Sequence, residues 1–236
     1  MVRGIKVSIN YAGSDTLTTA LTLEKNLLTN MPTLTSLKIK EVDTKAIQTQ
    51  ILTSQYIHDC QAYVSILGNI VVKARQCQPL LHVYYHGKEF YIDREGKQLS
   101  LSKEGKSHVM VANGHFTQKD TVLAAIPNIH TAENDSLRSN YDIVKLWQLA
   151  HYLDKKDYLA LFDQIYIDRQ GDLLLTPKLG THVVNVGSPD NLDTKFKHLM
   201  ALYKQALPRV GWDRYNLVTL KFKDQLVCQK KERART

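Results

Sequence analysis

The chain of 236 residues lacks the features that mark several classes of protein. Its three cysteines, Cys60, Cys77 and Cys228, are too few for a disulfide scaffold, and without a Cys-x-x-Cys pair a cysteine zinc site is not expected. No apolar run approaches the roughly 18 residues that cross a bilayer, and no apolar stretch follows the first basic residue as in a signal peptide. These absences predict either a soluble protein without a leader or the soluble part of a longer one.

Motifs that carry chemistry are also missing. The sequence contains no Gly-x-Ser-x-Gly elbow, no phosphate-binding loop and no His-Glu-x-x-His. His82 and His86 are four residues apart, but their strand and turn context keeps them off a common helix face. Asp93 and Asp168 would be candidate paired carboxylates, yet their places in two turns explain them. We therefore predict no enzyme, with no catalytic, metal-binding or cofactor-binding residue and no cofactor.

The net charge of +8 and the pI near 9.2 call for an explanation. Part of the excess lies in the tail, residues 230–235, which we interpret as a solvated, disordered end; contact with anionic lipid or nucleic acid is the alternative. Nucleic-acid modules interleave basic and aromatic residues along one face, and no such stripe is present. The charge alone therefore does not predict a nucleic-acid partner.

One short sequence motif, called the repeated phrase below, occurs twice. Residues 91–97 and 166–172 both begin Tyr-Ile-Asp-Arg and carry Gly at the sixth position, Gly96 and Gly171. The aspartate side chain can accept the backbone N–H two residues on, and glycine adopts the positive φ that closes such a turn. Each copy therefore predicts a β-hairpin.

The first 79 residues predict a small α+β unit. Asp43 is the expected N-cap of its second helix, and Gly68-Asn69 the expected two-residue turn of its hairpin. The predicted elements are a strand at 4–10, helices at 16–30 and from 44, and strands at 60–67 and 70–78.

The same hairpin leaves two alternatives for its cysteines. If Gly68-Asn69 is a strict two-residue turn, Cys60 and Cys77 face each other across the strands, close enough for a disulfide. A bulge or a longer turn would remove that pairing and leave two free thiols.

The second part of the sequence predicts an antiparallel sheet with two helices covering one face. The first helix spans 135–153. The second is expected to begin at Ser188-Pro189, with N-cap and N1 residues in their preferred order, and to end at Pro208. The predicted strands lie at 80–85, 88–93, 97–101, 108–112, 162–168, 173–176, 182–186, 217–222 and 226–229.

With these residues described, the chain resembles the extracytoplasmic part of the FtsQ/DivIB family of bacterial cell-division proteins, in the version of the Bacteroidetes branch. Residues 56–64 and 68–76 resemble the end of a family helix and the strands after it, and 90–96 resemble its Ile-Asp-x-x-Gly hairpin. The most specific blocks are 202–212 and 216–230. The junction 76–79 departs from the family pattern, because it has a proline but no arginine.

The resemblance implies an α+β fold in two domains: a POTRA-like βααββ domain at 1–79 and a β domain at 80–230, followed by a basic disordered tail at 231–236. It also implies a non-enzymatic divisome scaffold in the cell inner membrane. A single membrane helix is expected upstream, with this region on the periplasmic side. The implied partners are an FtsB–FtsL pair and other membrane division components, with no nucleic acid.

The family binds its partner on and around the last hairpin, by adding a strand to the sheet edge. Carried over, Lys221 and Phe222 close the penultimate strand, with Phe222 as the apolar anchor, and Asp224 and Gln225 form the turn. The edge-strand residues carried over are Leu226, Val227 and Cys228. Core packing of Phe222 and Val227, and simple solvation of Lys221 and Asp224, are the alternatives.

Two other functions are kept as alternatives. An outer-membrane assembly or secretion component that binds β-strand clients would also carry POTRA units, but it would carry several or precede a barrel. An enzyme acting on cell-wall polymer would need acidic and basic residues converging in a cleft.

Overall fold

The structure is a computed structural model, and it describes residues 1–11, 13, 15–117, 128–129, 141–223 and 225–231. These residues form two compact units. Unit 1 comprises Met1–Pro79 and Leu99–His108, and unit 2 comprises Leu80–Gln98 and Val109–Thr236. The division at Pro79 coincides with the expected domain boundary, whereas Leu99–His108, which the expected second domain includes, groups with unit 1.

Hydrogen bonds show why Leu99–His108 belongs to unit 1. The Ser102 hydroxyl donates to the carbonyl oxygen of Leu17 at 2.5 Å, and the backbone N–H of Ser100 donates to the side-chain oxygen of Gln55 at 3.1 Å. Such long-range bonds leave no trace in a local sequence pattern.

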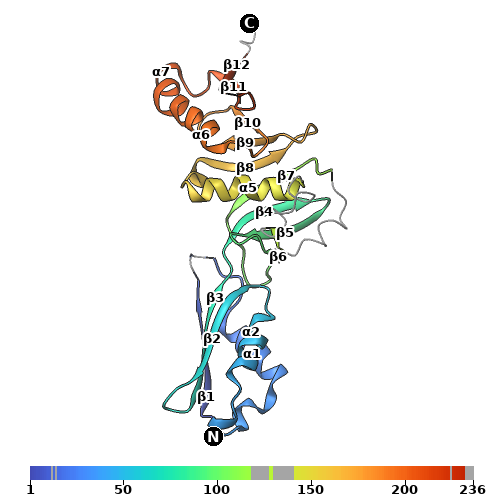
Figure 1. Cartoon of the computed structure of the whole chain (residues 1–236), viewed down its shortest axis with the longest axis vertical. Helices are drawn as coiled ribbons and strands as arrows, with labels where there is room; N and C mark the ends of the chain where they lie inside the picture. The colour runs from blue at the N-terminus through green and yellow to red at the C-terminus, as the bar shows by residue number, and fades with distance from the viewer. Residues whose placement is uncertain (12, 14, 118–127, 130–140, 224, 232–236) are drawn as a thin grey trace. The chain divides into compact units, whose positions relative to one another are not determined.

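Unit 1 has the predicted order of strand, helix, helix, strand, strand, which confirms the βααββ arrangement. Its three-stranded sheet has the order β1-β3-β2, with β1 parallel and β2 antiparallel to β3. The helices bury Leu23, Leu27, Ile47 and Ile51 against the sheet. The elements, drawn in blue and cyan in Figure 1, are β1 (Gly4–Asn10), α1 (Ala20–Asn30), η1 (Pro32–Ser36), η2 (Ile39–Glu41), α2 (Thr44–Leu52), β2 (Ile57–Val64) and β3 (Asn69–Gln76).

Side-chain caps fix where these helices begin. The Asp43 carboxylate accepts the backbone N–H groups of Lys45 at 2.9 Å and Ala46 at 3.1 Å, as the sequence predicted. The first helix begins at Ala20 rather than at residue 16, because Thr19 caps it through the N–H of Thr22.

The hairpin of unit 1 turns differently from the prediction. A four-residue turn runs from Ser65 to Gly68, closed by the bond from the Gly68 N–H to the Ser65 carbonyl oxygen at 2.8 Å. The longer turn shifts the register, so that Cys60 pairs with Ala74 and not with Cys77. Of the two alternatives for these cysteines, the one with free thiols therefore holds, and Cys60, Cys77 and Cys228 are all free.

Among its described residues, unit 2 is built on a nine-stranded sheet with the order β12-β11-β10-β9-β8-β7-β4-β5-β6; the first residue of β4 and the last two of β6 belong to unit 1. The strands are β4 (Pro79–Tyr85), β5 (Lys88–Asp93), β6 (Gln98–Ser100), β7 (Met110–Gly114), β8 (Phe162–Ile167), β9 (Leu173–Pro177), β10 (Val183–Gly187), β11 (Tyr215–Thr219) and β12 (Val227–Lys230).

The sheet is mixed, so the α+β class is confirmed but the antiparallel assignment was wrong. β4 pairs with β7, β7 with β8 and β10 with β11, all in parallel. Parallel neighbours need a long crossover, usually a helix. The chain supplies one through α5 (Asp142–Lys155), between β7 and β8, and another through α6 (Leu192–Ala201), between β10 and β11.

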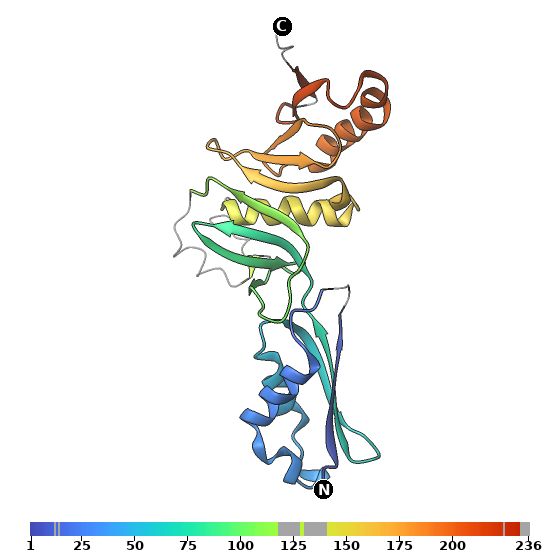
Figure 2. The ribbon, with the colours of Figure 1, turned by 180° about the vertical axis from the view of Figure 1, so that it is seen from behind.

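Both crossover helices lie on one face of the sheet, in front in Figure 1 and behind the strands in Figure 2. The predicted inward stripe of α5 is confirmed, because Ile143, Leu146, Trp147 and Ala150 are all buried. The expected start of this helix at residue 135 lies outside the described residues.

The second crossover helix begins later than predicted, and two further helical segments carry the chain past the predicted end at Pro208. It starts at Leu192 behind Asn191, whose left-handed backbone takes the N-cap position, so Ser188 does not cap it. After α6 the chain makes a π-helical turn, Leu202–Ala206, and the short helix α7, Leu207–Val210. Pro208 lies in the first turn of α7, where its missing N–H costs nothing, and the helix ends at Gly211.

The repeated phrase forms two turns with the same hydrogen bonds. The Asp93 carboxylate accepts the N–H groups of Glu95 at 3.0 Å and Lys97 at 2.7 Å, and the Asp168 carboxylate accepts the equivalent pair, both at 2.9 Å. Gly96 and Gly171 have φ values of 78° and 81°. The hairpin prediction is therefore confirmed at both places.

The two turns differ in burial, so replacing their aspartates should lower the unfolding free energy by unequal amounts. Asp93→Ala removes an acceptor from two N–H groups in a buried turn, and we expect unit 2 to lose about 2–3 kcal/mol of unfolding free energy. Asp168→Ala should cost about 1 kcal/mol, because water can reach the half-buried second turn. The fluorescence of the chain's two tryptophans, both in unit 2, during urea titration measures this. Equal losses would contradict the prediction.

Candidate functional site

The last strand of the chain, β12, forms one border of the unit 2 sheet. Within the described part of the chain it pairs with β11 alone, in antiparallel register from Thr219 opposite Val227 to Tyr215 opposite Lys230. A strand in this position has unpaired N–H and C=O groups on its outer side. Among the described residues, β6 forms the opposite border.

The apolar residues around β12 fall into two sets. Leu226 and Cys228 are half-buried against the core of unit 2. Phe222 and Val227 point elsewhere, with 54% and 44% of their surfaces exposed. The alternative in which Phe222 and Val227 are core residues therefore does not hold. An exposed phenylalanine beside an open strand edge is the kind of apolar surface that a partner can cover.

The chain before β12 runs differently from the expected hairpin. β11 ends at Thr219, so Lys221 and Phe222 follow the strand instead of closing it. The parallel ladder between β10 and β11 stops at Asn185 opposite Thr219, two residues before β10 ends at Gly187. Gln225 lies in the connection and donates its N–H to the Phe222 carbonyl oxygen at 3.4 Å, whereas Asp224 lies outside the described residues.

Lys221 is held in place by an ion pair and is not simply solvated. Its ammonium group lies 2.8 Å from the carboxylate of Asp172, which also accepts a bond from the Asn185 side chain at 3.3 Å. The hydrogen bond to Asp172 raises the pKa of Lys221. The second copy of the repeated turn, which ends at Asp172, thus orients a residue beside the sheet edge.

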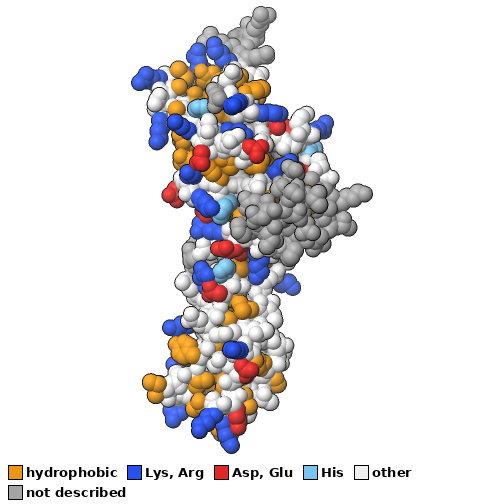
Figure 3. Space-filling view, in the orientation of Figure 1, with side chains coloured by type: hydrophobic (Ala, Val, Ile, Leu, Met, Phe, Trp, Pro, Cys, Tyr) orange, Lys and Arg blue, Asp and Glu red, His pale blue; other side chains and the backbone are white. Residues whose placement is uncertain are grey.

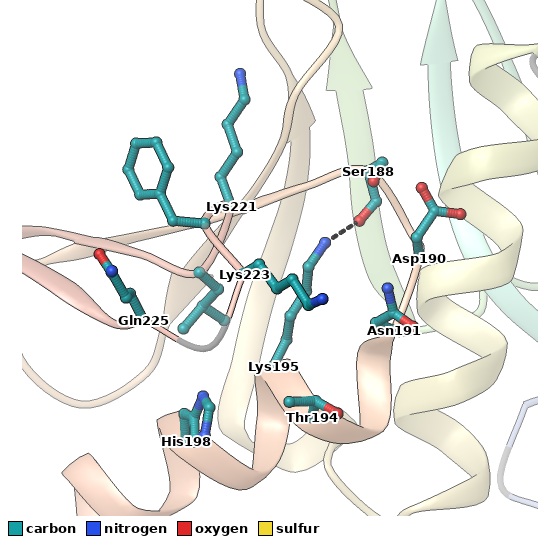
Figure 4. Close-up of a pocket in the computed structure, with 11 residues that line it drawn as sticks. Ser188, Asp190, Asn191, Thr194, Lys195, His198, Lys221, Lys223 and Gln225 are labelled. Carbon is teal, nitrogen blue, oxygen red and sulfur yellow. Dashed lines mark hydrogen bonds between the residues drawn. The ribbon is translucent and has the colours of Figure 1, made fainter.

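A pocket of about 380 Å³ lies between the start of α6 and the chain that follows β11. Figure 4 shows Lys195 and Lys223 reaching into this space from its two sides. Lys195 donates to the Ser188 carbonyl oxygen at 2.7 Å, and burial lowers its pKa. The charged or titratable residues of the lining are Asp190, Lys195, His198, Lys221 and Lys223.

The sequence interpretation missed the α6 side of this pocket. Lys195 and His198 alternate with the apolar stripe of α6, and nothing in that pattern separates them from ordinary surface residues. Only the parallel pairing of β10 with β11 brings them beside Lys221 and Lys223.

A buried polar pair supports the start of β11. The His182 ring nitrogen Nε2 lies 2.9 Å from the Tyr203 hydroxyl, and the Tyr203 ring packs edge-on against Trp212 at 5.3 Å. Burial lowers the pKa of His182 and raises that of Tyr203. These rings connect β10, the π-helical turn and the residues that lead into β11.

Lys231, the first residue of the expected basic tail, makes two hydrogen bonds. Lys231 was assigned to the disordered end, but its backbone N–H donates to the Arg214 carbonyl oxygen at 3.1 Å and its ammonium group to the Thr181 hydroxyl at 2.5 Å. Residues 232–236 lie outside the described part of the chain.

The other residues considered for chemistry do not form a site. Asp93 and Asp168 cap their own turns, and His82 contacts Glu89 at 3.4 Å. Within the described residues, no group of three or more His, Cys, Asp or Glu side chains is arranged to hold a metal ion. In the same part of the chain, no helix has the length and apolar character needed to cross a membrane.

Comparison with protein-family models assigns most of unit 2 to a known family. Residues 78–229 match the model of a protein family described as FtsQ/DivIB, C-terminal related. The matched region contains every strand from β4 to β11 and most of β12. No curated protein matches the chain.

The buried His182 predicts a pH dependence of unit 2. Because its pKa is lowered in the folded state, the unfolded chain takes up a proton at higher pH. Stability should therefore be full above pH ~6.5 and fall below it, by at most about 1.4 kcal/mol per pH unit. The His182→Gln variant should not show the part of this fall in stability that arises from protonation of His182. Urea titrations of both proteins between pH 8 and about pH 5 test this, and parallel curves would contradict it.

Proposed function

The chain belongs to the FtsQ/DivIB-related family of bacterial cell-division proteins, and from this premise we propose that it is a non-enzymatic scaffold that holds an FtsB–FtsL pair. In this proposal the pair binds by adding a strand to the outer side of β12, and the complex helps to regulate septal cell-wall synthesis. The observation that carries the proposal is the border position of β12 next to an exposed Phe222.

The mechanism follows from the hydrogen-bonding needs of the backbone. An incoming extended peptide pairs its N–H and C=O groups with the outer side of β12, which supplies affinity with little regard to sequence. Side chains then supply register, because alternate residues of the added strand face the same side of the sheet.

The residues around β12 take different roles in this arrangement. Phe222 is the apolar anchor, and Val227 adds a second exposed apolar contact. Leu226 and Cys228, which are half-buried against the core, hold the edge strand on the sheet. Lys221 offers a positive charge oriented by Asp172, while Gln225 and, outside the described residues, Asp224 complete the connection.

The proposed location is the cell inner membrane, with this region on the periplasmic side and an anchoring helix elsewhere in the full protein. This rests on the family, whose members are membrane-anchored division proteins. The same match favours a division protein over an outer-membrane assembly component.

Phe222→Ala should weaken binding of an FtsB-type partner at least tenfold and leave the fold intact, because truncating an aromatic anchor costs about 2 kcal/mol or more. A titration of the partner pair against both proteins measures this. Leu179→Ala is the matched control, since Leu179 is equally exposed in unit 2 but is not near the β11–β12 connection. Unchanged affinity for Phe222→Ala would remove Phe222 from the site.

Proline substitution separates strand addition from side-chain contact. Consecutive residues of an edge strand direct their N–H groups alternately inward and outward, so Cys228→Pro and Gln229→Pro remove one bond of each kind. We expect the variant that loses the inward bond to be less stable. The other should stay folded and bind the partner at least tenfold more weakly. If the stably folded variant binds normally, the partner does not pair with the β12 backbone.

A capture experiment tests the proposal as a whole. The chain and a version without its last fifteen residues are used to pull down proteins from an envelope extract. Recovery of FtsB- and FtsL-type proteins by the full chain alone supports the proposal. Recovery by neither protein, or by both, contradicts it.

A further inference from the structure

The β2–β3 turn of unit 1 presents two large apolar side chains to solvent. Ile66 is fully exposed and Leu67 is 66% exposed. These residues occupy the two central positions of the turn, between Ser65 and Gly68. Central turn positions favour Gly, Pro, Asn, Asp and Ser, so a pair of large aliphatic residues contradicts the local preference. Such contradictions are expected where function and not folding selects the residue.

The turn is well ordered. The Gly68 N–H donates to the Ser65 carbonyl oxygen, the Ser65 N–H to the Asn69 carbonyl oxygen, both at 2.8 Å, and the Asn69 N–H to the Ser65 hydroxyl at 3.1 Å. Gly68 supplies the required φ of 81°. The bonds therefore hold Ile66 and Leu67 at the outermost point of a closed hairpin.

Basic residues surround the base of this turn. The Arg3 N–H donates to the Gly68 carbonyl oxygen at 2.9 Å, and a Cβ added to Gly68 would lie 3.3 Å from the Ile39 side chain. Ile39 is itself 44% exposed and lies between the exposed Lys38 and Lys40. We name these six residues together the unit 1 tip: Arg3, Lys38, Ile39, Lys40, Ile66 and Leu67.

The charge of the unit 1 tip is positive. Arg3, Lys38 and Lys40 carry three positive charges, and the carboxylate of Glu41 accepts the backbone N–H of Lys38 at 3.1 Å. Figure 1 shows the β2–β3 turn at the same end of unit 1 as the chain's N-terminal residues, and Figure 3 shows hydrophobic and basic side chains together at that end.

We propose that the unit 1 tip docks on an anionic lipid surface, with Ile66 and Leu67 inserted below the headgroups and the basic residues in contact with them. A protruding apolar turn is a convex shape that enters a deformable lipid layer without needing a matching groove. Lysine and arginine at its base lie at headgroup level, with their stems along the apolar boundary. Cations near an anionic surface add attraction that falls off within a Debye length. This docking is independent of the binding proposed at β12.

Vesicle binding tests the proposal with the full chain. At about 0.15 M salt we expect the chain to bind vesicles of equal parts phosphatidylglycerol and phosphatidylcholine, and to bind pure phosphatidylcholine vesicles at least tenfold more weakly. The Ile66→Asp/Leu67→Asp variant should bind the anionic vesicles at least tenfold more weakly than the unmodified chain. Absence of binding to anionic vesicles overturns the proposal.

Comparison of the single substitution Leu67→Asp with a matched variant elsewhere in unit 1 excludes a general effect of added charge or lost apolar surface. Leu21→Asp alters an equally exposed residue, at 76%, near the opposite end of unit 1, and should change vesicle binding by less than twofold. Leu21 follows shortly after Leu17, whose backbone N–H donates to the side-chain oxygen of Gln76. Gln76 is the last residue of β3, at the end of that strand far from the β2–β3 turn. Equal losses in both variants would overturn the proposal.

The basic residues are tested in the same way. Lys38→Glu/Lys40→Glu should weaken binding to anionic vesicles at least tenfold. Lys103→Glu/Lys106→Glu makes the same change of charge in the segment that bonds to residues 15–22, at the Gln76 end of unit 1. If the Lys103→Glu/Lys106→Glu variant loses as much binding to anionic vesicles, the net charge of the chain and not the unit 1 tip attracts the lipid. Circular dichroism of each variant confirms that unit 1 is folded.

Discussion

The parallel ladder between β10 and β11 is the interaction on which the candidate site of unit 2 depends. Three residue pairs, Val183–Leu217 to Asn185–Thr219, join the last ribbon to the rest of the sheet. The bond from the Leu220 N–H to the Asn185 carbonyl oxygen at 2.7 Å extends this junction by one step. Without it, β11 and β12 would form an isolated two-stranded ribbon, which is marginally stable in water.

The crossover helix α6 explains why this ladder is parallel and what lies beside it. The chain leaves β10, crosses one face of the sheet and returns to β11 from the same end. That path places Lys195 next to the connection between β11 and β12, and the same connection exposes Phe222. The exposed edge and the basic pocket are thus two results of one topology.

Unit 1 and unit 2 combine a stable core with one exposed feature each. In unit 2 the exposed feature is a strand edge, which offers backbone hydrogen bonds to a guest peptide. In unit 1 it is an apolar turn beside basic residues, and hydrogen bonds of Ser65, Gly68 and Asn69 close this turn. The two features therefore suit different kinds of partner, a protein strand in one case and a lipid surface in the other.

Local sequence patterns determined the elements whose hydrogen bonds are local. The Asp43 cap, the two aspartate–glycine turns and the inward face of α5 followed from residues a few positions apart, and the structure contains all of them. The family could also be inferred from the order of such elements.

Tertiary structure alone decided the features that join distant residues. The parallel partners of the sheet, the return of Leu99–His108 to unit 1 and the approach of Lys195 to Lys223 all depend on contacts across many residues. The four-residue turn at Ser65 moved Cys60 away from Cys77, because a change in turn length shifts the register of the whole hairpin. A sequence pattern specifies which residues favour a strand, whereas the identity of its neighbour is decided by how the connecting chain packs.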